Sequence, residues 1–205
     1  METAIYKIEK AKIKDSQLTA TYEERFKTEN YSNVIEKKCS QVIHADLKNV
    51  VDNLRVHLAC ICEMPEAERI RELGVYDFPA EDLSSYVVTG YSHDGSDESA
   101  GVTIIGQKLL KSGKVLNLIS PFIQFEDTDA YPFAGELCSE IEACDYEVDQ
   151  YLFHEKYGIK QMELDFDVPE DVNVSITVDG VTKPVRKRGR KKKAEIAAKS
   201  FDETA

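Results

Sequence analysis

A run of positive charge near the end of the chain limits where a folded domain can lie. Eight of the eleven residues from Lys183 to Lys193 are lysine or arginine. The whole chain has a formal charge of −12, so subtracting these eight positive charges leaves −20 on the remainder. So steep a separation is typical of a folded acidic body that carries a basic tail. The sequence predicts a globular domain over residues 1–180 and a basic, largely disordered tail over 181–205.

The basic tail is expected to bind a polyanion, with nucleic acid as the favoured partner. Each lysine or arginine that neutralises a phosphate releases condensed counterions, so the affinity should fall steeply with salt. The tail residues expected to contact phosphate are Lys183, Arg186, Lys187, Arg188, Arg190, Lys191, Lys192 and Lys193. A solvated tail without a dedicated target, and a nuclear-import signal in a eukaryotic host, are two alternatives.

The centre of the tail also carries a short motif. Arg188-Gly189-Arg190 resembles the core of an AT-hook, in which a small residue between two arginines lets an extended backbone lie in a narrow minor groove. Lys191 stands where that motif has a proline, which argues against strict minor-groove specificity. The resemblance implies DNA binding, and the sequence leaves open whether single-stranded DNA, double-stranded DNA or RNA is preferred.

The body is expected to form one α+β domain. Hydrophobic residues make up 42% of the chain, and a chain of this length can bury about 70% of its unfolded surface in a single core. Alternating patterns predict strands over 4–14, 17–25, 34–43, 86–91, 102–110, 115–125, 160–166 and 172–178. Apolar stripes at spacings of three and four predict two main helices, over 47–61 and 137–152. Together these predict an antiparallel sheet packed with two main helices.

Cysteine usage and hydropathy bear on the compartment. The five cysteines are odd in number and fall within predicted strands or helices, as expected for buried thiols in a reducing compartment. The N-terminus lacks the order of an exported leader, and the longest apolar run, from Val115 to Ile123, is interrupted by polar residues and a proline. The sequence predicts a cytoplasmic protein with no membrane partner.

Two features of the body bear on its partners. Lys108, Lys111 and Lys114 lie near one predicted turn and are expected to add a second phosphate contact. Four aromatic residues on the neighbouring strands could stack on bases, although burial in the core is the favoured interpretation for each. These residues are Tyr86, Tyr91, Phe122 and Phe125.

The second predicted helix carries an acidic face. Its members are Glu136, Glu140, Glu142, Asp145, Glu147 and Asp149. A solvated surface is the simplest interpretation, but such a face could also imitate the phosphates of DNA. The alternative function is therefore an acidic protein-interaction module, a DNA mimic or anti-defence factor that acts on a host protein.

Catalytic and metal-binding patterns are weak. The segment from Ser92 to Ser99 gathers His93 with carboxylates and hydroxyls, but it lacks the spacing of a calcium loop, and a solvated loop is favoured. The thiols of Cys60 and Cys62 lack zinc-ligand spacing. The sequence therefore predicts a non-enzymatic protein with no catalytic residues, metal or cofactor.

Several short strings resemble a group of uncharacterised proteins in tailed-phage genomes. They are Val88-Thr-Gly-Tyr-Ser92, Gly101-Val-Thr-Ile-Ile-Gly-Gln107, Gly113-Lys-Val-Leu-Asn-Leu118 and Tyr131-Pro-Phe-Ala-Gly-Glu136. The resemblance covers most of 47–160 and implies a setting in phage DNA metabolism inside a bacterial cytoplasm. With the basic tail, it leads us to expect a DNA-binding accessory protein in replication, recombination or single-stranded DNA binding.

Overall fold

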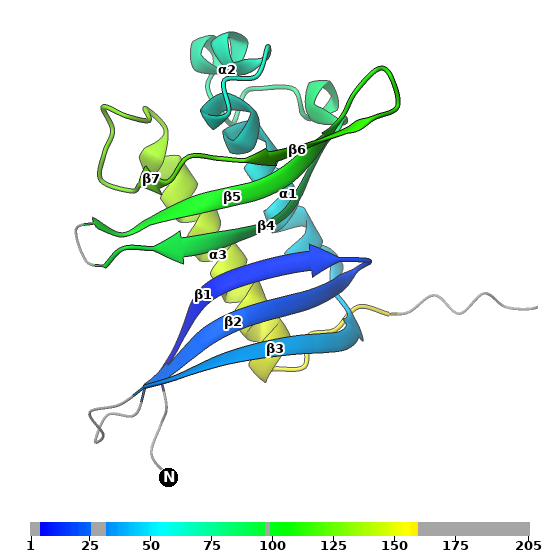
Figure 1. Cartoon of the computed structure of the whole chain (residues 1–205), viewed down its shortest axis with the longest axis vertical. Coiled ribbons are helices and arrows are strands. Elements are labelled where there is room, and N and C mark those ends of the chain that lie inside the picture. The colour runs from blue at the N-terminus through cyan, green and yellow to red at the C-terminus, as the bar shows by residue number, and fades with distance from the viewer. Residues whose placement is uncertain (1–4, 26–31, 97–98, 160–205) are drawn as a thin grey trace, which may run out of the picture. The chain divides into compact units, whose positions relative to one another are not determined.

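The fold is an antiparallel sheet with helices on one face, seen in a computed structural model that describes residues 5–25, 32–96 and 99–159 (Figure 1). Within these ranges the sheet has seven strands and is accompanied by three α-helices. The predicted α+β class is therefore confirmed. The strands predicted over 160–166 and 172–178, and the whole basic tail, lie outside the described residues.

The first half of the sheet is a three-stranded meander. Strand β1 (Ile5–Lys14) and strand β2 (Gln17–Arg25) form the predicted hairpin, and β3 (Ser32–Val42) pairs antiparallel with β2. The two turn residues, Asp15 and Ser16, have φ values of 51° and 59°. Left-handed φ at both positions is typical of a type I′ turn, whose twist matches that of the flanking strands.

The second half is another meander, made of β4 (Tyr86–Asp94), β5 (Gly101–Leu109) and β6 (Val115–Ile119), with the short β7 (Ile123–Gln124) also pairing with β5. The prediction of a single strand over 115–125 is wrong, because β6 ends at Ile119 and β7 begins at Ile123. There the Ser120 N–H still donates to the Ile104 carbonyl oxygen at 2.9 Å, but the Ile104 N–H donates to the Ser120 hydroxyl, also at 2.9 Å, rather than to a backbone carbonyl. The following proline has no N–H to donate.

A short junction between β1 and β4 joins the two meanders. The strand order is β3-β2-β1-β4-β5-β6, so the central pair is not consecutive in sequence. Only Lys10, Ala11 and Lys12 of β1 pair with β4, opposite Ser92, Tyr91 and Gly90. On both sides of this junction the two strands diverge (Figure 1).

Two long helices cover one face of the sheet (Figure 1). They are α1 (Ala45–Ile61) and α3 (Ala134–Phe153), and the shorter α2 (Ala67–Leu73) and a 3-10 turn, η1 (Ala80–Leu83), follow α1. Leu47, Leu54 and Leu58 of the predicted α1 stripe are fully buried. In the described part of the chain, no helix is both long and apolar enough to span a membrane. The opposite face of the sheet is left without a covering helix in these ranges.

Candidate nucleic-acid interface

Lysines alternate along β1 on the open face of the sheet. Successive side chains of a strand point to opposite faces. Ala11 and Ile13 point toward the helices and pack in or against the core, whereas Lys10, Lys12 and Lys14 are exposed. The three ammonium groups therefore belong to the face that the helices leave open.

The strand register adds a fourth lysine and two hydroxyls to this surface. Lys12 lies opposite Thr19 of β2, and Thr19 lies opposite Lys38 of β3. In the next row Lys10 lies opposite Thr21. A hollow of about 370 Å³ runs over these strands. We call Lys10, Lys12, Lys14 and Lys38 the lysine patch.

The charges of the lysine patch are available to a ligand. Across residues 5–25, 32–96 and 99–159, Lys10, Lys12 and Lys14 take part in no ion pair, and Lys38 has one contact with Glu36 at 3.5 Å. The Lys38 and Glu36 side chains are both well exposed, and such a surface pair contributes little because water competes for both partners. The patch can therefore offer its ammonium groups to an anion at small cost.

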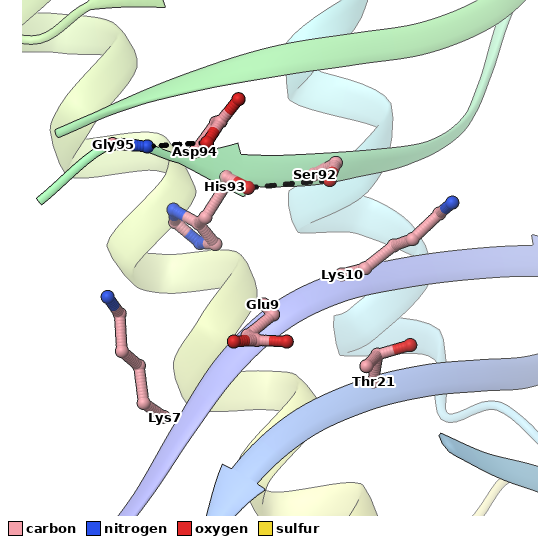
Figure 2. A pocket seen from close by; sticks show the side chains of 8 residues that line it. All are labelled: Lys7, Glu9, Lys10, Thr21, Ser92, His93, Asp94 and Gly95. Atoms are coloured by element: carbon pink, nitrogen blue, oxygen red, sulfur yellow. Dashed lines mark hydrogen bonds between the residues drawn. The ribbon is translucent and has the colours of Figure 1, made fainter. Parts of the chain in front are cut away.

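A second hollow, of about 290 Å³, lies where Lys10 of β1 meets Ser92 of β4, at one end of the junction between the two strands (Figure 2). Here Lys7 and Lys10 share the lining with Glu9 and Asp94, so the charge is mixed. The interpretation of Ser92 to Ser99 as a single loop is wrong at its start, because β4 continues to Asp94. His93 consequently lies in a strand, and its Nε2 is 2.9 Å from Asp145 Oδ2 on α3.

A larger cleft, of about 740 Å³, occupies the opening where β1 and β4 diverge beyond Lys12. Lys12 and Lys14 line it from β1, and Lys48 lines it from α1. Its other wall is formed by β4, β5 and β6. We call this the fork cleft.

The three body lysines singled out by the sequence do not act together. Lys108 is on the helix side of the sheet, where its ammonium lies 3.0 Å from Glu66 Oε1 and 2.5 Å from the Tyr86 hydroxyl, with only 14% of its side chain exposed. Lys111 and Lys114 are exposed in the turn between β5 and β6. Lys108 is therefore engaged inside the fold, whereas Lys111 and Lys114 are exposed but do not line the hollow over the lysine patch. The tail lysines and arginines are outside the described residues.

The aromatic residues considered for base stacking are mostly in the core. Tyr86 and Tyr91 are fully buried, so the favoured interpretation, burial, is confirmed for these two, and Phe125 is partly buried against the core. Phe122 is 44% exposed. The open face consequently offers lysines, threonines and aliphatic side chains rather than an aromatic platform.

The acidic residues of α3 do not form one solvated face. Asp145 accepts a hydrogen bond from the buried Tyr91 hydroxyl at 2.7 Å, and Glu147 is bound by Lys156 at 2.7 Å with 11% of its side chain exposed. The prediction of a solvated run is wrong for these two residues, because α3 is in contact with the sheet and with the chain that follows it. An imitation of DNA would have fewer free carboxylates than the sequence indicates.

Two polar side chains of the long helices, the buried His57 on α1 and the half-buried Glu140 on α3, each have a buried atom without a hydrogen-bond partner in the described residues. The His57 Nδ1 is 2.7 Å from the Tyr131 hydroxyl, whereas the His57 Nε2 and the Glu140 Oε2 have no partner among the described residues. Burial lowers the pKa of His57 to about 4 and raises the pKa of Glu140 to about 7. The neutral forms of both groups are therefore favoured by the fold.

Comparison of the chain with protein-family models, with curated proteins and with solved structures finds no match. The resemblance to tailed-phage proteins stays an expectation from the sequence. The function is therefore inferred from the residues and their geometry.

The lysine patch was missed at the sequence level, although a signal was present. Lys10, Lys12 and Lys14 alternate with Ala11 and Ile13, which is the period of a strand with one buried and one solvated face. The apolar half of this alternation predicts the core residues, and the other half predicts the charged face.

Proposed function

We propose that this protein is a non-enzymatic DNA-binding accessory protein that holds phosphates on the lysine patch of its open sheet face. The basic run from Lys183 to Lys193 would provide a second contact. A role in phage replication, in recombination or in protecting single-stranded DNA, inside a bacterial cytoplasm, is the setting that the sequence resemblance implies.

One observation carries the proposal: Lys10, Lys12 and Lys14 share one open face on a chain whose formal charge is −12. Most of the surface of such a protein repels a phosphate backbone. A local concentration of unpaired lysines is the exception that allows close approach, and each phosphate contact gains free energy by releasing counterions. Thr19 and Thr21 add hydroxyl donors between the lysine rows.

The alternative function, an acidic module that docks on a host protein, is less well supported. Asp145 and Glu147 are engaged by Tyr91 and by Lys156, so fewer carboxylates are free to meet a partner. An acidic mimic also has no use for the lysine patch.

Fluorescence anisotropy with labelled DNA at low salt tests the proposal. Lys10→Gln/Lys12→Gln removes two exposed lysines from the patch, and Lys111→Gln/Lys114→Gln removes two exposed lysines from the β5–β6 turn as a matched control. The proposal predicts that the patch variant loses about tenfold in affinity, and that the turn variant loses clearly less. Equal losses from both variants, or no DNA binding by the wild-type protein, would contradict it.

A further inference from the structure

We infer that the fork cleft holds bases of a single DNA strand whose phosphates lie on the lysine patch, so that the protein prefers single-stranded DNA to duplex. This inference rests on the proposed function and adds the site and the form of the ligand. It is carried by the shape of the fork and by the two kinds of side chain that line it.

The fork cleft exists because β1 and β4 pair over a very short distance. Their pairing ends at Lys12 and Gly90. Beyond that point Ile13 and Lys14 of β1, and Val87 to Thr89 of β4, line opposite sides of the same cleft of about 740 Å³. Its volume falls within the range of about 300–1,000 Å³ that is usual for small-molecule sites. The cleft is therefore large enough to take part of a nucleic-acid strand.

One wall of the fork cleft is basic. Lys12, Lys14 and Lys48 line it, and none of the three is in an ion pair within the part of the chain that the structure describes. The acidic residues of the lining are Asp15 and Asp52. Asp52 is already bound by Arg55 at 3.3 Å, which offsets its charge. The basic wall is continuous with the lysine patch through Lys12 and Lys14.

The other wall and the floor of the cleft are aliphatic. Val87 and Ile119 are 52% and 68% exposed at the rim, beside the half-buried Ile105. Val88 and Leu118 close the floor and are buried. Exposed aliphatic side chains in a cleft gain free energy when an apolar surface covers them.

Two amide side chains supply polar groups beside the aliphatic wall. The Gln107 Nε2 donates to the Asn117 Oδ1 at 3.0 Å. In the described residues this leaves the side-chain carbonyl oxygen of Gln107 and both amide N–H groups of Asn117 without a partner. Both residues line the fork cleft, so they can accept from and donate to the edge of a base.

A single strand fits this combination better than a duplex does. In a duplex the bases are paired and stacked, and the grooves expose only their edges, so the aliphatic wall has no flat base face to contact. An unpaired nucleotide presents an anionic group on one side and a flat, largely apolar base on the other. The fork cleft has the matching arrangement, with lysines on β1 and α1 facing aliphatic and amide groups on β4, β5 and β6.

The test compares full-length variants on an oligothymidylate longer than the usual site of about 4–16 nucleotides, and on a duplex of equal length. Val87→Ser/Ile119→Ser removes two exposed aliphatic side chains from the cleft. Leu109→Ser/Val115→Ser is the matched control, because these residues are 56% and 55% exposed at the far end of the β5–β6 hairpin, which neighbours β4, but do not line the cleft. All four side chains are exposed, so neither variant should unfold, which a melting curve checks.

The wild-type protein should bind the single strand more tightly than the duplex. The cleft variant should lose at least about fivefold in single-strand affinity, with duplex affinity unchanged, whereas the control variant should keep both. If Lys10→Gln/Lys12→Gln weakens binding but the cleft variant leaves the ratio of single-strand to duplex affinity unchanged, this inference fails and the proposed function stands. If no DNA binds, or if the lysine variant binds like wild type, both fail.

A second readout does not depend on any variant. A 2-aminopurine base within the single strand fluoresces more strongly when it leaves the stack of its neighbours. Binding to the wild-type protein should raise that fluorescence, because a base in the fork cleft lies against aliphatic side chains rather than other bases. Tight binding without a change in fluorescence at any position along the strand would overturn the inference.

Discussion

Gly90 of β4 lies so close to Ala11 of β1 that a Cβ atom on Gly90 would come within 2.3 Å of the Ala11 carbonyl oxygen. The contact is with backbone, which cannot move aside as a flexible side chain can. The residue at position 90 is therefore restricted to glycine at the junction that joins the two halves of the sheet and sets the edge of the fork cleft.

Gly90→Ala should lower the free energy of unfolding by about 1–3 kcal/mol, because the two strands must separate to admit the methyl group. Gly135→Ala, in the first turn of α3, is the control, since a Cβ there meets nothing within 4 Å and a helix accepts alanine at least as well as glycine. Urea unfolding of the two variants measures both effects. Equal stability of both variants would show that the junction is looser than the structure indicates.

Lys108→Gln should reduce stability without reducing DNA affinity. The Lys108 ammonium is bound by Glu66 and lies over the ring of Tyr86 at 4.4 Å, so its loss leaves a partly buried carboxylate with one partner fewer. We expect a loss of about 1–3 kcal/mol in the free energy of unfolding. Thermal melting and anisotropy on the same sample separate the two effects. A fall in affinity with unchanged stability would restore Lys108 as a phosphate contact.

Glu140→Gln should make the protein more stable at pH 8 but not at pH 4.5. Burial raises the pKa of Glu140 from its ordinary 4.5 to about 7, so between these values the folded state keeps a proton that the unfolded state releases. The stabilisation from that proton is complete below pH 4.5 and is lost as the pH rises through 7. A neutral amide avoids the loss.

The gain for Glu140→Gln at pH 8 should be about 1–3 kcal/mol, given about 1.4 kcal/mol for each pKa unit and partial solvation of the carboxylate. Urea unfolding of both proteins from pH 4.5 to pH 8 measures it. The titration of His57 is common to both proteins and cancels in the difference. If the difference in free energy of unfolding between the two proteins does not change with pH, the burial of this carboxylate is contradicted.

Individual strands and helices were predictable from the sequence where the pattern within one segment determines which side chains face the core. The strand alternation of residues 4–25 and the apolar stripe of 47–61 both report which side chains face a core, and the observed β1, β2 and α1 follow them. The pairing of β1 with β4 was not predictable in this way, since it joins residues about eighty positions apart and only three pairs hold it.

The candidate site was harder to predict for the same reason. Lys12 and Val87 line one cleft because β1 and β4 are adjacent and diverge, and nothing in either strand alone indicates it. For Lys108, closeness in sequence wrongly predicted closeness in function. It is near Lys111 in sequence, yet the strand turns its side chain toward Glu66 on the helix side.

Removal of the tail after Gly180 should weaken binding to single-stranded and duplex DNA by similar factors. The eight cationic residues of the tail would contact phosphates, which both forms share, whereas the fork cleft would supply the discrimination between the forms. Anisotropy with the truncated and full-length proteins gives the ratio of single-strand to duplex affinity for each protein. Loss of the preference for single strands on truncation would assign selectivity to the tail instead.

The most direct test of the lysine patch is the salt dependence of single-strand affinity, compared between wild type, Lys10→Gln/Lys12→Gln and Lys111→Gln/Lys114→Gln. Each phosphate contact contributes about −0.7 to the slope of log affinity against log salt on a single strand. Loss of two contacts should therefore make the slope shallower by about 1.4 in the patch variant, while the turn variant keeps a slope nearer to wild type. An unchanged slope in the patch variant would show that Lys10 and Lys12 do not contact phosphate, and the account of the open sheet face would be wrong.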